Sequence, residues 1–122
     1  MIIWLTGLSG SGKTTISKEF LKITKKKKYN FINIDGDLIR EVYNDKLGYS
    51  KKDRVIQIKR IQKIALYLNK QNCNIIVSAL YSNATLLKWN RENLKNYIEI
   101  YVKTSMQELI RRDQKKLYSK FF

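Results

Sequence analysis

The feature that most constrains this chain is a glycine-rich stretch that directly follows its first apolar segment. Residues 7–14 read Gly-Leu-Ser-Gly-Ser-Gly-Lys-Thr and match the pattern G-x-x-x-x-G-K-[ST] at every position. The apolar, β-rich segment Ile2–Thr6 precedes the stretch, and Ile16, Phe20 and Ile23 recur at helical spacing after it. This context predicts a buried strand, a loop that can hold phosphate, and an amphipathic helix.

The residue types in the loop predict a site for ATP with Mg²⁺. Glycines let backbone N–H groups converge on phosphate oxygens, and the helix that begins there adds positive partial charge. Lys13 is expected to reach the β- and γ-phosphates, and the hydroxyl of Thr14 to bind Mg²⁺. A glycine turn without a ligand is the alternative, and the full match in its proper context argues against it. The predicted ATP-binding residues are Gly7, Leu8, Ser9, Gly10, Ser11, Gly12, Lys13, Thr14 and Thr15.

Strand-like and helix-like segments alternate along the rest of the chain. Further strands are predicted at 29–34, 73–80 and 97–102, and helices at 13–24, 38–44, 51–71, 85–94 and 105–114. The helix at 51–71 is expected to begin at a capping box formed by Ser50 and Asp53. This alternation predicts an α/β phosphate-loop NTPase fold, a doubly wound parallel sheet of about four strands with flanking helices, in a single domain over residues 1–122.

Composition limits the setting and the partners. The chain has 25 Lys and Arg against 10 Asp and Glu, a net charge of +15, no His and one Cys. A disulfide within the chain and a Cys/His zinc site are therefore excluded, and the apolar runs are too short to span a bilayer, so we expect a cytoplasmic protein without membrane contact. The tetrad Lys25–Lys28 leaves nucleic-acid binding open as an alternative, but lysine is spread over the whole chain, so no specific nucleic-acid partner is expected.

Four separated motifs resemble the adenylylsulfate kinase family in order and spacing. They are Trp-Leu-Thr-Gly-Leu-Ser-Gly-Ser-Gly-Lys-Thr-Thr at 4–15, Asp35-Gly36-Asp37 with Arg40, Leu47-Gly48-Tyr49-Ser50 with Asp53-Arg54, and Arg-Asp-Gln-Lys-Lys-Leu-Tyr at 112–118. The resemblance implies transfer of the γ-phosphate of ATP to the 3′-hydroxyl of adenylylsulfate, giving 3′-phosphoadenylylsulfate in sulfate activation. A small nucleotide is therefore the expected substrate.

The resemblance also implies residue roles that suit the residue types. Either acid of the Asp35-Gly36-Asp37 turn could help hold Mg²⁺ and orient or deprotonate the acceptor hydroxyl. The planar guanidinium groups of Arg40 and Arg54 suit an acidic phosphosulfate group. Tyr49, where the family usually has Phe, could stack on a base. The implied catalytic residues are Lys13, Asp35, Asp37 and Lys115, the last on a lid. The implied acceptor-binding residues are Asp37, Arg40, Tyr49, Arg54, Gln57 and Leu80, and the implied metal ligands are Thr14 and Asp35.

Plain structural roles remain open for several of these residues. Arg40, Arg54 and Lys115 could be solvated charges on helices, and Tyr49 could be a core aromatic. A bare Asp-Gly-Asp could be no more than a turn after a strand.

The chain departs from the family pattern where the acceptor is recognised. The stretch Leu80-Tyr81-Ser82-Asn83-Ala84 replaces the family's Ile-Ser-Pro followed by an aromatic residue and Arg, and Gln57 replaces an Asn. A related conjugate, such as cytidine diphosphoramidate in surface-polysaccharide modification, is therefore an alternative acceptor. An inactive remnant that still binds ATP is a further alternative.

Members of the resembled family continue beyond the lid motif, whereas this chain stops at Phe122. We therefore expect a truncated domain that lacks the end of the lid and the last strand and helix. A sheet shortened in this way exposes an edge and an apolar face, which predicts low solubility or self-association, including a homodimer.

Overall fold

The computed structural model describes residues 1–7, 10–79 and 81–103. In this part of the chain, four strands form one parallel sheet in the order β2-β3-β1-β4. The strands are β1 (Ile2–Thr6), β2 (Phe31–Asp35), β3 (Asn74–Ser78) and β4 (Tyr97–Tyr101). The predicted α/β class and the parallel sheet are therefore confirmed.

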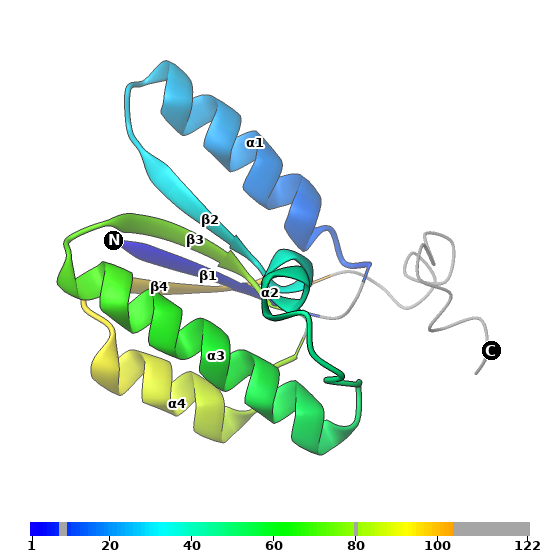
Figure 1. Cartoon of the computed structure of the whole chain (residues 1–122). Helices are drawn as coiled ribbons and strands as arrows, with labels where there is room; N and C mark the ends of the chain where they lie inside the picture. The colour runs from blue at the N-terminus through cyan, green and yellow to red at the C-terminus, as the bar shows by residue number, and fades with distance from the viewer. Residues whose placement is uncertain (8–9, 80, 104–122) are drawn as a thin grey trace.

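Helices cover both faces of this sheet. They are α1 (Lys13–Lys26), α2 (Gly36–Tyr43), α3 (Lys51–Lys70) and α4 (Ala84–Asn93). Figure 1 shows α1 on one side of the sheet, α3 and α4 together on the other, and α2 beyond the carboxyl ends of the strands. None of the helices within the described residues combines the length and apolar character needed to cross a membrane.

The predicted boundaries differ from the structure by one or two residues at several elements. Helix α2 begins at Gly36 instead of Leu38, because the Asp35 side chain caps it. Two further differences have a common origin at the end of α1. The helix continues to Lys26, because cations are favourable near a helix carboxyl terminus. The chain then turns at Lys28, which has a φ of 63°, and the backbone N–H of Tyr29 donates to Thr24 O at 2.9 Å. This turn delays β2 to Phe31. The helix predicted at 105–114 lies outside the described residues.

The core is divided by the sheet into two layers. On the side of α3 and α4, buried side chains include Ile2, Trp4 and Ile75 of the strands and Ile61 and Ala65 of α3. The layer under α1 is smaller and contains the buried residues Ile3, Leu5, Ile76 and Val102, with Phe20, Leu21 and Phe31 packed against them. Strand β1 is buried on both faces, as its apolar sequence predicts.

Among the described strands, β4 lies at an edge of the sheet and keeps apolar side chains accessible. Ile98 and Ile100 pair in register with Ile3 and Leu5, yet each is 42% exposed. These two side chains match the apolar exposure expected from the sequence. Self-association through them stays a prediction.

A chain of polar contacts joins α3, α4 and β4. The amide nitrogen of Gln62 donates to Asn90 Oδ1 at 2.9 Å, and Asn90 Nδ2 donates to Tyr97 OH at 3.2 Å. Burial raises the pKa of Tyr97 well above its usual range, so the hydroxyl stays protonated and donates to Glu99 at 2.8 Å. Arg91 donates to the other oxygen of Glu99 at 2.5 Å. The edge strand is thereby tied to the helices behind it.

We predict that Asn90→Ala destabilises the fold, because it removes a fully buried side chain and leaves the Tyr97 hydroxyl with one partner fewer. The free energy of unfolding should fall by about 2 kcal/mol in urea denaturation. Asn93→Ala, an exposed change on the same helix, is the control and should cost about 0.5 kcal/mol or less. Equal losses in the two variants would refute a special role for the network.

Candidate active site

The carboxyl ends of the parallel strands bring the two predicted catalytic segments to one edge of the sheet. Residue 7, which follows β1, opens the glycine loop, and Asp35 at the end of β2 opens the acidic turn. In register, Leu5 and Asp35 both pair with Ser78 of β3, from its two sides. With strands about 4.8 Å apart, β1 and β2 lie roughly 10 Å from each other at this edge. Ligands of open parallel sheets bind at such an edge.

The glycine loop is built from conformations that other residues rarely adopt. The φ angles of Gly7, Gly10 and Gly12 are 147°, 81° and 106°. Gly12 is also the N-cap of α1 and provides no capping side chain for the first backbone N–H groups of the helix. These groups are the ones that hold anions at helix amino termini. The described part of the loop therefore has the backbone of a phosphate site.

Lys13 folds back over the loop. Lys13 is only 8% exposed. Its Nζ donates to the carbonyl oxygen of Gly7 at 2.7 Å and to Ser11 Oγ at 3.5 Å. A buried ammonium group needs such partners to offset its lost hydration. Phosphate oxygens offer stronger, charge-assisted hydrogen bonds than a carbonyl does. The ammonium group of Lys13 is thus held where it could bind a phosphate in the loop.

The first residue of the loop is fixed against the end of β4. Val102 N donates to Thr6 O at 2.8 Å, and a Cβ atom on Gly7 would lie 2.6 Å from Val102 O. Thr6 also donates through Oγ1 to Ser82 Oγ at 2.9 Å, which brings the segment after β3 to the end of β1. The sequence pointed to no role for Thr6, because no motif pairs it with a residue so distant in the chain.

The acidic turn is closed by its own first residue. Asp35 is the N-cap of α2, and its Oδ1 accepts from the backbone N–H of Asp37 at 2.9 Å. The carbonyl of Gly36, between the two acids, accepts from Gln57 Nε2 of α3 at 2.8 Å. Asp35 is half-buried and Asp37 exposed. The turn therefore presents two carboxylates at the sheet edge on a fixed backbone.

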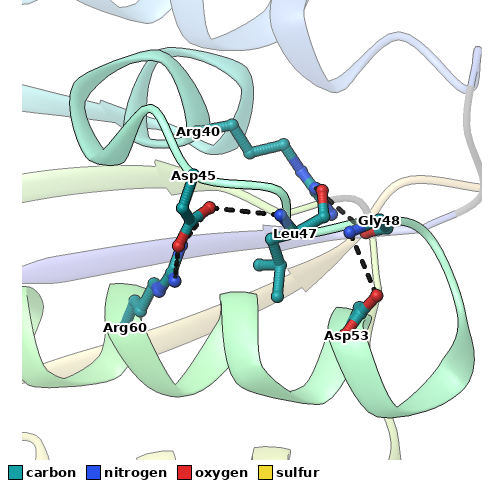
Figure 2. A network of polar contacts seen from close by, with 6 residues as sticks. All are labelled: Arg40, Asp45, Leu47, Gly48, Asp53 and Arg60. Carbon is teal, nitrogen blue, oxygen red and sulfur yellow. Dashed lines mark hydrogen bonds and ion pairs between the residues drawn. The ribbon is translucent and has the colours of Figure 1, made fainter.

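The segment between α2 and α3, residues 44–50, is held from both sides (Figure 2). Nη1 of Arg40 donates to the carbonyls of Leu47 and Gly48 at 3.0 Å each, and Gly48 N donates to Asp53 Oδ2 at 3.0 Å. The Arg40 guanidinium also lies 4.2 Å from the centre of the Tyr49 ring. Arg40 is thus a clamp on this segment, and the solvated-charge alternative for it is wrong. Tyr49 is 57% exposed, so the core-aromatic alternative is wrong too.

An ion pair that the sequence-based predictions did not include supports the same segment. Asp45 forms an ion pair with Arg60 of α3, visible in Figure 2, and accepts from Leu47 N at 3.3 Å. The Arg60 guanidinium lies 4.1 Å from the centre of the Tyr43 ring. Hydrogen bonding from Arg60 lowers the pKa of the Asp45 carboxyl below its ordinary value of 3.8. Opposite charge was the only signal in the sequence for this pairing.

The remaining predicted residues divide into three groups. Leu8, Ser9, Leu80 and Lys115 lie outside the described residues. Thr14 and Thr15 are exposed in the first turn of α1. On α3, Arg54 is half-buried, with Nε buried and lacking a hydrogen-bond partner among the described residues, and Gln57 is 5% exposed. The functional roles assigned to all of the predicted site residues, including those described above, stay predictions.

The predicted metal ligands suit Mg²⁺ in kind. Thr14 offers a hydroxyl on the loop and Asp35 a carboxylate at the same sheet edge. Within the described residues, no three His, Cys, Asp or Glu side chains gather in one group. Mg²⁺ in phosphoryl-transfer sites takes only one or two protein oxygens and completes its shell with water and phosphate. These two side chains therefore fit a metal that arrives with a nucleotide.

We predict that Gly7→Ala disrupts the glycine loop, because the new methyl group would meet a backbone carbonyl and the φ of 147° is unfavourable for alanine. The loss should be about 1–3 kcal/mol in thermal unfolding, with loss of any stabilisation by Mg²⁺·ATP. Gly48→Ala is the control, since its Cβ would meet the Asp53 side chain, which can move. An unchanged nucleotide response in Gly7→Ala would contradict the assignment.

We further predict that Asp45→Asn loosens residues 44–50 in a pH-dependent manner. Because the pKa of Asp45 is lowered in the folded state, its pairing with Arg60 stabilises at neutral pH and is lost as pH falls through that pKa. Melting temperatures of wild type and variant should therefore differ at pH 7 and converge near pH 2. Glu92→Gln, which removes an exposed pair with Lys88 at 3.8 Å, should show little difference at either pH.

Comparison with known proteins places the chain among small-molecule kinases. Residues 1–121 match the family model described as Adenylylsulphate kinase. Cytidine diphosphoramidate kinase of Campylobacter jejuni is 44% identical over 119 residues, covering 98% of this chain and 69% of that protein. Adenylyl-sulfate kinase of Pseudomonas aeruginosa is 38% identical over 122 residues, covering 98% of this chain and 62% of that protein. The chain spans about two thirds of the length of these relatives.

Solved structures agree with this assignment. The APS kinase of Mycobacterium tuberculosis, in complex with AMPPNP and APS, superposes with a TM-score of 0.85 at 30% identity, covering 98% of this chain and 71% of that structure. A shikimate kinase of Bacteroides thetaiotaomicron, at 22% identity and a TM-score of 0.64, shares the fold alone. The predicted phosphate-loop fold is thereby confirmed. With a family model that matches nearly its whole length, this chain belongs to the adenylylsulphate kinase family of phosphotransferases.

Proposed function

We propose that this protein uses Mg²⁺·ATP to phosphorylate the 3′-hydroxyl of a nucleotide conjugate that ends in an acidic group. The observation that carries the proposal is the shared sheet edge. Lys13, buried in the glycine loop, and the acidic turn at Asp35 and Asp37 stand at the carboxyl ends of β1 and β2, with β3 between them. One edge thus offers a phosphate donor site next to carboxylates that can serve an acceptor.

The proposed reaction is an in-line phosphoryl transfer. The acceptor oxygen bonds to the γ-phosphorus as the bond to the β,γ-bridging oxygen breaks, and ADP leaves with that electron pair. The hydroxyl proton passes to a carboxylate of the turn, Asp35 or Asp37. Lys13 and the backbone N–H groups at the start of α1 stabilise negative charge on the phosphates. Mg²⁺, held by Thr14 and Asp35, would neutralise further charge when bound.

Residues 44–50 support the acceptor end of the proposal. Arg40 clamps this segment, and the exposed Tyr49 ring lies against the Arg40 guanidinium. An exposed aromatic ring beside a fixed cation can stack on a base and favour a nearby anionic group. Both features suit a nucleotide that carries an acidic substituent.

Two acceptors have specific support. The 44% identity to a cytidine diphosphoramidate kinase favours cytidine diphosphoramidate, as does the departure from the family pattern at 80–84. The family model and the 38% identity to an adenylyl-sulfate kinase favour adenylylsulfate. We propose cytidine diphosphoramidate as the first acceptor to test and adenylylsulfate as the second.

The test is ADP release from Mg²⁺·ATP by the full chain with each acceptor in turn. We predict release that requires one acceptor and falls by about 100-fold or more in Lys13→Ala. Lys18→Ala, an exposed lysine on the same helix, is the control and should retain activity. ATP binding without ADP release in the presence of either acceptor would indicate an inactive remnant. ADP release at the same rate with and without an acceptor would indicate a simple ATPase.

A further inference from the structure

Gln57 of α3 lies beneath the acidic turn and contacts its central peptide. The residue is 5% exposed, and its Nε2 donates to Gly36 O at 2.8 Å. Gly36 separates Asp35 from Asp37, and the Asp35 side chain already binds the N–H of Asp37. The local bond fixes the two acids relative to each other, whereas the Gln57 contact fixes the pair relative to α3.

The turn also packs closely on what lies below it. A Cβ atom on Gly36 would lie 3.7 Å from Ser78 O, 3.8 Å from Ile61 Cδ1 and 3.9 Å from Gln57 Nε2. These distances are ordinary van der Waals contacts, so the turn rests on the end of β3 and on α3 with room for a methyl group at position 36. The hydrogen bond from Gln57 is therefore the polar contact that ties the Gly36 peptide, and with it the carboxylates on either side, to α3.

The amide of Gln57 is committed in one orientation. Because a carbonyl can only accept, the NH₂ group must face Gly36 O, and Oε1 is then buried without a hydrogen-bond partner among the described residues. An unpaired buried acceptor lowers stability, so an apolar residue of similar size would suit the core better. Because Gln57 is only 5% exposed, little of its surface is accessible to an acceptor molecule.

We propose that Gln57 is a positioning residue, which sets the place of the Asp35–Asp37 carboxylates through Gly36 and does not itself bind the acceptor. This inference rests on the proposed function, because the carboxylates are taken to serve the reaction. It assigns to Gln57 a different role from the acceptor contact that the family resemblance implies.

The test replaces Gln57 by methionine, which keeps the length and removes the donor. Gln62→Met is a matched control, since Gln62 lies on the same helix, is 4% exposed, and donates to Leu86 O and Asn90 Oδ1 on the side of α4. Each variant is measured for kcat, for KM of ATP and acceptor, for melting temperature, and for amide hydrogen exchange over residues 36–43.

We expect Gln57→Met to lower kcat by about 10-fold or more, since small misplacements of catalytic groups are costly, with KM values within about twofold. Exchange in residues 36–43 should rise, while the melting temperature stays near that of wild type. Gln62→Met should lower the melting temperature without changing kcat or this exchange. The side-chain amide in Gln57→Asn is too short to reach Gly36, so this variant should behave like Gln57→Met. It replaces Gln57→Met in the test if methionine prevents folding.

Unchanged exchange over residues 36–43 in both Gln57 variants would overturn the proposal, and so would an unchanged kcat. An effect confined to the KM of the acceptor would also overturn it, because that result indicates direct binding. Hydrogen exchange needs no turnover. If the protein phosphorylates neither acceptor, the proposed function fails, while the exchange result still decides whether Gln57 holds the turn.

Discussion

The parallel pairing of β1 with β3 is the constraint on which the rest of the structure depends. β1 is buried on both faces, joins β3 on one side and β4 on the other, and ends at Gly7. β3 in turn sets the end of β2, because Asp35 pairs with Ser78. The glycine loop and the acidic turn therefore take their places from one set of backbone hydrogen bonds. A one-residue slip would also exchange the two apolar layers.

Around this frame, the site is held mainly by side chains that bind backbone. Lys13 binds the carbonyl of Gly7, Gln57 that of Gly36, Arg40 those of Leu47 and Gly48, and Asp53 the N–H of Gly48. The bonds of Lys13, Arg40 and Asp53 are charge-assisted and therefore stronger than neutral ones such as that of Gln57. Together they fix segments that lack regular structure. The same polar residues that suit phosphate chemistry thus give the loops their shape.

The local features and the parallel sheet were predictable from the sequence, and the side-chain contacts between elements were not. The glycine loop and the capping of α3 by Ser50, which accepts from Asp53 N at 3.1 Å, depend on residues close in the chain. The contacts of Gln57 with Gly36 and of Asp45 with Arg60 join residues 21 and 15 positions apart. They depend on how α2 rests against α3, which periodicity alone does not specify. The sequence predicted a role for Arg40 in acceptor binding, but only the structure shows its hydrogen bonds to the backbone of the 44–50 segment.

The contact between Gly7 and the end of β4 has a consequence for the edge of the sheet. Val102 binds Thr6 through its N–H, and its carbonyl fills the space in which Gly7 would otherwise carry a side chain. Edge strands are the parts of sheets most prone to shift register or to pair with another chain. Here any such shift would displace the first peptide of the phosphate loop. The geometry of the nucleotide site therefore depends on the correct register of β4, although this strand contributes none of the predicted site residues.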